Sequence, residues 1–144
     1  MTTILIINGP NLNMLGTREP EIYGHDTLND IEVLCRETAD KFGYQIDFRQ
    51  SNHEGEIIDW IQQARGRVDA IGINAAGYTH TSVAIHDALK LSDLPVAEIH
   101  LSEPKEREEF RHHSYIEAVA KIHVSGKGKD SYRIAIEELH GILS

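Results

Sequence analysis

The loop after the first apolar segment carries residue types suited to acid–base chemistry. Ile4–Ile7 is an uninterrupted apolar run typical of a buried strand, and the chain then passes through glycine, proline and asparagines to Arg18 and Tyr23. A guanidinium beside a phenol favours the phenolate, so Tyr23 could act as a base well below its ordinary pKa of about 10. An apolar strand feeding such a loop is typical of a ligand site at the carboxyl edge of a parallel sheet.

Polar side chains also gather at the ends of three predicted strands. They fall at 8–11, which includes Asn8 and Asn11, at 74–80, and at 98–102. The carboxyl ends of parallel strands share one edge, so we expect these segments to meet there. Arg111 follows about ten residues after the last of them and could fold back over the same edge. Turn formation remains the alternative role for either asparagine.

His100 is the sharpest candidate for an acid. Glu98 stands two positions earlier, which places both side chains on one face of a strand. The carboxylate could then fix one imidazole nitrogen and leave the other free for chemistry. A purely structural pair remains the alternative, as does helix capping or surface exposure for His80 and surface charge or packing for Arg18 and Tyr23.

Strand-like and helix-like segments alternate along the whole chain. This order predicts an α/β fold, flavodoxin-like in three layers, with a five-stranded parallel sheet of order 2-1-3-4-5 in one domain, residues 1–144. The predicted strands are Thr3–Asn8, Tyr44–Arg49, Asp69–Asn74, Pro95–His100 and Lys121–Ser125. The predicted helices are Thr27–Phe42, Glu54–Arg65, His80–Leu91, a short one at Lys105–Phe110, and Asp130–Leu143. In the third long helix, Val83, Ala84, Asp87, Ala88 and Leu91 form the expected inward face.

Composition narrows the class of protein. The chain has 144 residues, 40% of them apolar, and no apolar run near the roughly 20 residues that span a bilayer. We therefore expect a cytoplasmic protein with no membrane partner, which one unpaired cysteine, Cys35, also favours. The net charge of −9 argues against a nucleic-acid partner but leaves room for a small anionic substrate.

The chain lacks the residue patterns for nucleotide binding, imine catalysis and metal binding. The chain contains neither a G-x-G-x-x-G motif nor a Walker A motif. No lysine falls at the carboxyl end of a predicted strand, which argues against imine chemistry. The adjacent pair His112 and His113 has no ligand partner at suitable spacing, so we expect no metal. The remaining histidines receive no predicted role: His25, His53, His86, His123 and His140.

Five motifs, in order, make the sequence resemble type II 3-dehydroquinate dehydratase over nearly its full length. They are NGPNLN with LG, REP and YG at 8–24, QSNHEG at 50–55, NAAGYTHTS at 74–82, EIHLS at 98–102, and REEFR with HSY at 107–115. The resemblance implies a flavodoxin-like fold with no cofactor or metal, and a dodecamer of trimers. It also implies conversion of 3-dehydroquinate to 3-dehydroshikimate and water through an enolate, without a Schiff base, in the shikimate pathway (aromatic amino acid biosynthesis) or in quinate catabolism.

The resemblance also implies a role for each matching residue. Tyr23 looks like the base, Arg18 the cation that keeps it ionised, and His100 the acid, oriented by Glu98. Asn11 would hold a water against the enolate oxygen. The implied substrate contacts are Asn74, His80, Leu101, Ser102 and Arg111, with Asp87 reaching a neighbouring subunit.

Two departures from the family pattern stand near the implied site. Ala75 replaces the usual proline, and Glu103 replaces a common asparagine. Glu103 would put a negative charge next to the expected carboxylate site. Two functions of other classes also remain open: a non-catalytic module that binds a small polyol acid, and a structural oligomer with a degenerate site.

Overall fold

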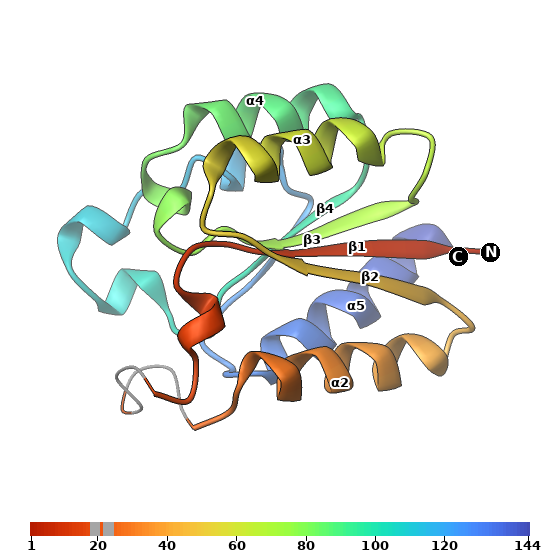
Figure 1. Cartoon of the computed structure of the whole chain (residues 1–144), viewed down its shortest axis with the longest axis horizontal. Coiled ribbons are helices and arrows are strands. Elements are labelled where there is room, and N and C mark those ends of the chain that lie inside the picture. Colours follow the sequence, from red (N-terminus) through yellow and green to blue (C-terminus); the bar gives the residue numbers. More distant parts are fainter. Residues whose placement is uncertain (18–20, 22–24) are drawn as a thin grey trace.

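A five-stranded parallel sheet forms the middle layer of the molecule (Figure 1). A computed structural model of the chain describes residues 1–17, 21 and 25–144. The strands β1 (Thr3–Asn8), β2 (Gln45–Gln50), β3 (Ala70–Asn74), β4 (Val96–Ile99) and β5 (Ile122–Val124) lie in the order β2-β1-β3-β4-β5. This α/β architecture and strand order confirm the predicted fold class.

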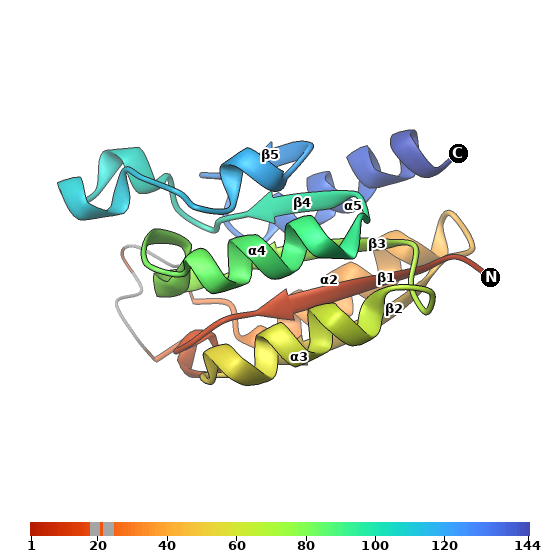
Figure 2. The ribbon, with the colours of Figure 1, turned by 90° about the horizontal axis from the view of Figure 1, so that it is seen from above.

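Two helices cover each face of the sheet. The helices α2 (Leu28–Asp40) and α5 (Asp130–Leu143) pack on one face, and α3 (Glu54–Ala64) and α4 (Val83–Ser92) lie side by side on the other (Figures 1 and 2). Every residue of β3 is buried, as expected for a central parallel strand covered on both faces. Within the described ranges, no helix is long and apolar enough to cross a membrane.

Local sequence signals fix where the helices begin. Thr27 accepts a hydrogen bond from the backbone N–H of Asp30, whose carboxylate accepts one from the N–H of Thr27, so α2 begins with a capping box. Ser82 caps α4 by accepting from the N–H of Ile85. Cys35 lies on the buried face of α2, and burial raises the pKa of its thiol to about 12, which fits a packed thiol rather than a nucleophile.

Two sequence predictions were wrong in detail. The third long helix begins at Val83 rather than His80, because residues Ala76–His80 form a 3₁₀ helix. Its buried face comprises Ile85, Ala88, Leu89 and Ser92. Of the five residues predicted to point inward, only Ala88 is buried, and the other four are exposed: Val83, Ala84, Asp87 and Leu91. The segment predicted as a helix at Lys105–Phe110 forms two 3₁₀ turns instead, Pro104–Glu106 and Glu109–Arg111.

A buried polar network joins α5 to the ends of β1 and β3. The Tyr132 hydroxyl donates to Asn8 Oδ1 at 2.6 Å and accepts from Asn74 Nδ2 at 3.1 Å. Asn8 and Asn74 are neighbours in the register of the two strands. Burial raises the pKa of Tyr132, so the phenol stays neutral and keeps the proton that it donates.

We expect Tyr132→Phe to lower the free energy of unfolding by about 1–3 kcal/mol, because two buried amide groups would lose a partner. Urea unfolding measures the loss. Tyr78→Phe is the matched control, since the Tyr78 hydroxyl donates to the carbonyl of Asn52 at an exposed site. Its expected loss is less than about 1 kcal/mol. Equal losses in the two variants would contradict a structural role for the buried network.

Candidate active site

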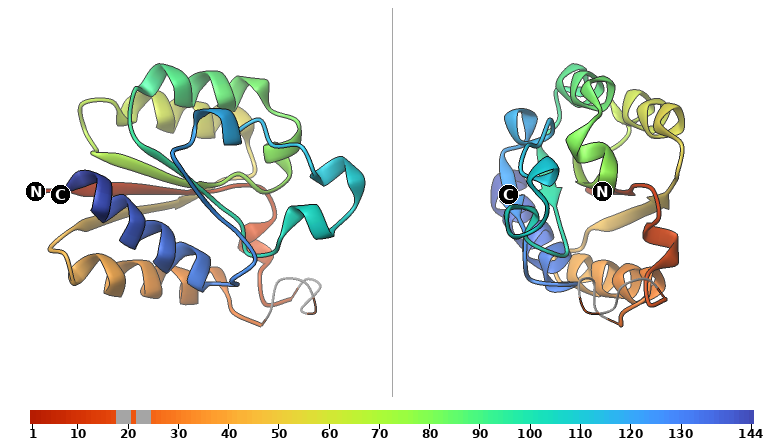
Figure 3. Two further views of the ribbon diagram at one scale, coloured as in Figure 1. Left: turned by 180° about the vertical axis from the view of Figure 1, so that it is seen from behind. Right: turned by 90° about the vertical axis from the view of Figure 1, so that its left-hand side faces the viewer.

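The ends of β1, β3 and β4 enclose a cavity of about 140 Å³ at the carboxyl edge of the sheet. The 3₁₀ turns Pro104–Glu106 and Glu109–Arg111 project beyond this edge, at the end of the molecule opposite the two termini (Figure 3). The residues predicted from strand ends meet here. The cavity is lined by Pro10, Asn11, Leu12, Asn74, Ala76, Gly77, His80, His100, Leu101, Ser102, Pro104, Arg107 and Arg111.

The turn after β1 passes against the end of β3. The N–H of Gly9 donates to the carbonyl of Asn74 at 2.8 Å, and a Cβ at Gly9 would lie 2.4 Å from the carbonyl oxygen of Ala75. Only glycine allows this approach. Asn11 then takes a left-handed conformation, with φ of 70°, and its N–H donates to the side chain of Asn52. The turn thereby places Asn11 on the cavity wall.

Asn74 is held on both sides of its amide. Its Oδ1 accepts from the N–H of Ala76 at 3.1 Å, and its Nδ2 donates to Tyr132. The side chain is therefore fixed in rotation, with its oxygen and nitrogen assigned by their partners. Asn8, by contrast, is fully buried and donates to the carbonyl of Arg49, so it supports the turn and does not line the cavity.

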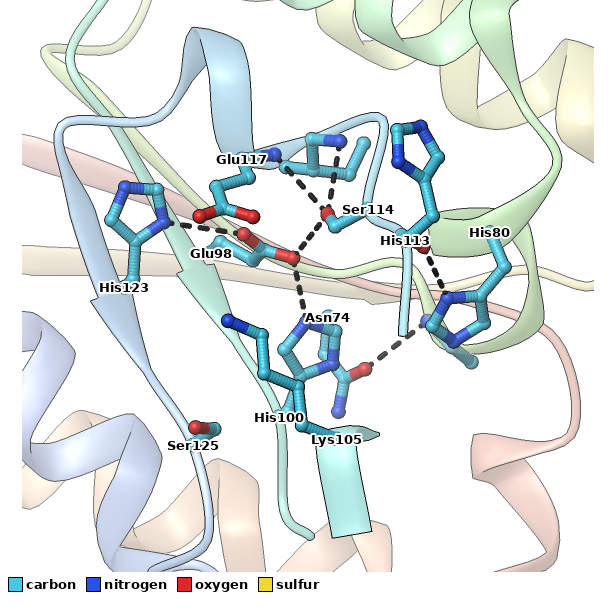
Figure 4. Close-up of polar contacts among 12 residues, drawn as sticks. Asn74, His80, Glu98, His100, Lys105, His113, Ser114, Glu117, His123 and Ser125 are labelled. Atoms are coloured by element: carbon cyan, nitrogen blue, oxygen red, sulfur yellow. Dashed lines mark hydrogen bonds and ion pairs between the residues drawn. The ribbon is translucent and has the colours of Figure 1, made fainter. Parts of the chain in front are cut away.

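His100 and Glu98 form the pair that their spacing predicts. His100 Nε2 lies 2.7 Å from Glu98 Oε2, and the two side chains are 13% and 6% exposed (Figure 4). Burial works to raise the pKa of Glu98, but hydrogen bonds from His100, Ser114 and His123 outweigh it and hold the pKa below its ordinary value. An ionised carboxylate only accepts, so His100 donates from Nε2 and its Nδ1 remains for other chemistry.

His80 faces the same cavity from the 3₁₀ helix after β3. Its Nδ1 lies 2.8 Å from the carbonyl oxygen of His113, so the proton sits on Nδ1. Burial, helped by the nearby charges of His100 and Arg111, lowers the pKa of His80. The neutral imidazole therefore offers Nε2 as an acceptor for a ligand hydroxyl.

Arg111 supplies a cation to the cavity. Its Nε donates to Glu108 at 2.8 Å, and its side chain is largely buried. Leu101 and Ser102 line the wall beside it. A guanidinium next to backbone and hydroxyl groups is a suitable arrangement for a carboxylate with neighbouring hydroxyls.

Glu103 points away from this wall. Its carboxylate accepts from the Ser125 hydroxyl and from the N–H of Lys105. It lines a second cavity, of about 430 Å³, and not the smaller one. The hydrogen bond from Ser125 lowers the pKa of Glu103, so its charge persists but is directed toward β5. The expected conflict with a substrate carboxylate is therefore relieved by orientation.

Two predicted site residues, Arg18 and Tyr23, lie outside the described residues. Two others, Asp87 and Glu98, do not line the small cavity. Asp87 lies on the exposed side of α4, where His86 contacts its carboxylate at 3.0 Å. Glu98 stands behind His100 and lines the larger cavity.

Several residues that shape this site were not predicted from the sequence. His123, given no role, contacts Glu98, and Ser114 donates to the same carboxylate at 2.6 Å. Tyr132 orients Asn74, and Arg107 lines the small cavity. Arg107 and Ser114 fall in motifs already noted, whereas Tyr132 and His123 carry no local signal because their partners are distant in sequence.

Comparison with known proteins places the chain in a family. The sequence profile described as Dehydroquinase class II matches residues 2–140. A 3-dehydroquinate dehydratase of Phenylobacterium zucineum is 58% identical over 139 residues, 96% of each chain. The 3-dehydroquinate dehydratase 2 of Pseudomonas putida is 54% identical over 97% of this chain and 94% of its own.

A solved structure is similar over the same extent. The type II dehydroquinase of Butyrivibrio crossotus superimposes with a TM-score of 0.93 and 44% identity, covering 96% of this chain and 97% of its own. Because the family profile, the similar sequences and the similar structure all agree, the chain belongs to the class II dehydroquinases.

Proposed function

We propose that the chain is a hydro-lyase that removes water from 3-dehydroquinate to give 3-dehydroshikimate. The observation that carries the proposal is the His100–Glu98 pair on a cavity shared with Asn74, His80 and Arg111. This set supplies an oriented acid, hydroxyl partners and a carboxylate partner. Membership of the class II dehydroquinases supplies the substrate.

The substrate is a β-hydroxy ketone, so elimination needs a base, a site for the enolate and an acid. We assign the base to Tyr23, with Arg18 holding the phenol ionised. The Tyr23 oxygen takes the proton α to the ketone, and the electron pair passes to the carbonyl oxygen as an enolate. Asn11 would hold a water against that oxygen. No lysine imine takes part in this path.

His100 completes the elimination. As the enolate collapses, the C–O bond breaks and the departing hydroxyl takes the proton from His100 Nδ1, leaving as water. Glu98 stabilises the imidazolium through its 2.7 Å contact with Nε2, which keeps Nδ1 directed away from the carboxylate. The fixed ring is thus prepared for general acid catalysis.

Other residues that line the cavity would bind the substrate. Arg111, with Leu101 and Ser102, would bind the carboxylate, and Asn74 and His80 would bind hydroxyls. Asp87 is exposed on α4, which suits the proposed contact with the site of a neighbouring subunit in a dodecamer of trimers. We place the reaction in the cytoplasm, in the shikimate pathway or in quinate breakdown.

The proposed function is tested by mixing the protein with 3-dehydroquinate and following ultraviolet absorbance. We expect absorbance of the conjugated enone to grow with time and in proportion to enzyme. Treatment with borohydride in the presence of substrate should leave activity intact, because no imine forms. A protein that binds 3-dehydroquinate but yields no enone would instead be the non-catalytic binding module.

Tyr23→Phe should reduce kcat by at least about 10²–10⁴-fold, because phenylalanine cannot accept the α proton. Calorimetric titration with product should show nearly unchanged binding. Tyr44→Phe, at the far end of the sheet, is the matched control and should keep normal turnover. Near-normal turnover of the Tyr23 variant would remove the phenol from the mechanism.

His100→Ala should lower kcat by about 10²–10⁴-fold while KM changes much less, since the lost group acts mainly on the departing hydroxyl. Steady-state kinetics separates the two parameters. His112→Ala changes an exposed histidine nearby and should have little effect. A large rise in KM with unchanged kcat would reassign His100 to substrate binding.

A further inference from the structure

The buried carboxylate of Glu98 is bound on both of its oxygens. Oε2 accepts from His100 at 2.7 Å and from the Ser114 hydroxyl at 2.6 Å. Oε1 lies 3.2 Å from His123 Nδ1 (Figure 4). The carboxylate is therefore shared between two imidazoles, and only one of them faces the proposed substrate cavity.

Sheet register places His123 against Glu98. The two residues are direct neighbours in the pairing of β4 and β5. Ile122 and Val124 point into the core beneath α5, so the side chain of His123 projects from the opposite face. His123 is 46% exposed there, on the wall of the 430 Å³ cavity. The pairing of the two strands therefore brings His123 and Glu98 into contact.

The hydrogen-bond directions are fixed by chemistry. Because an ionised carboxylate only accepts, His123 must carry its proton on Nδ1. Ser114 Oγ accepts from the N–H groups of Ile116 and Glu117, which orients its proton toward Oε2. His123 is thus the donor that holds Oε1, and without it one side of the carboxylate would lose this restraint.

We propose that His123 is a positioning residue, whose Nδ1–H fixes the Glu98 carboxylate so that Oε2 is held toward His100. This inference rests on the proposed dehydratase role of His100. The carboxylate is 6% exposed, so its rotation is set by these few partners. A fixed Oε2 in turn fixes the plane of the His100 ring and the direction of Nδ1.

Besides Glu98, other charged groups line the cavity beside His123. They are Glu103, Lys105, Glu106, Arg111 and Glu117. Glu103 is already bound to Ser125, Arg111 pairs with Glu108, and the other three are exposed. Within the part of the chain that the structure describes, the His123 side chain makes its polar contact with Glu98.

Two substitutions separate the hydrogen bond from the bulk of the side chain. His123→Val suits a strand but removes the donor, and His123→Asn keeps an N–H close to the position of Nδ1. We expect kcat to fall by about 3–10-fold in the valine variant, with KM within about twofold, and to recover in the asparagine variant. His112→Asn is the matched control on the same cavity.

Nitrogen-15 NMR of the histidine rings measures the effect of His123 on His100 without relying on turnover. The wild-type spectrum should show His123 as the Nδ1–H form at neutral pH. The Nε2–H resonance of His100 should move in His123→Val and return in His123→Asn, while His112→Asn leaves it in place. A merely structural His123 would not produce this recovery.

The proposal is overturned if wild-type His123 carries its proton on Nε2 alone, or if the His100 resonance is unmoved in a folded valine variant. The protonated nitrogen of His123 is measured in the wild-type protein, so this test does not depend on whether a variant folds. A wild-type protein that lacks dehydratase activity would refute the proposed function, whereas the NMR result would still decide whether His123 positions Glu98.

Discussion

A carboxylate buried beside a parallel sheet is the constraint around which the site is built. Removing Glu98 from water is costly unless donors replace the lost hydration. His100, Ser114 and His123 supply those donors, from the end of β4, from the loop after Arg111 and from β5. Satisfying one buried charge therefore connects three segments and, as a consequence, orients an imidazole toward the cavity.

A second buried network holds the ends of β1 and β3 together. The phenol of Tyr132 lies between the amides of Asn8 and Asn74, which are adjacent in the register of the sheet. The side-chain polar groups of Asn8, Tyr132 and Asn74 all have partners, so the network stabilises one arrangement of the strand ends. The proposed acid and the proposed hydroxyl partner thus depend on different elements, β5 and α5, which lie far from His100 and Asn74 in the sequence but contact their strands in space.

The chain departs from its family's common pattern at position 103, yet the structure accommodates the change. The negative charge of Glu103 would oppose a substrate carboxylate if it faced the small cavity. Its hydrogen bonds to Ser125 and Lys105 turn it toward the larger one. Prediction from sequence identified the charge correctly but not its direction, because direction depends on Ser125, which follows β5 and is 22 positions away.

Sequence alone determined the fold class, the strand order and most members of the cavity wall, because strand ends in a parallel sheet must share one edge. It also paired His100 with Glu98, since a spacing of two fixes a common face. Tertiary structure decided which face of α4 is buried, where Glu103 points, and which distant groups bind Glu98 and Asn74. Those outcomes depend on strand register and on packing between segments that are distant in sequence. Such contacts leave no local pattern in the sequence.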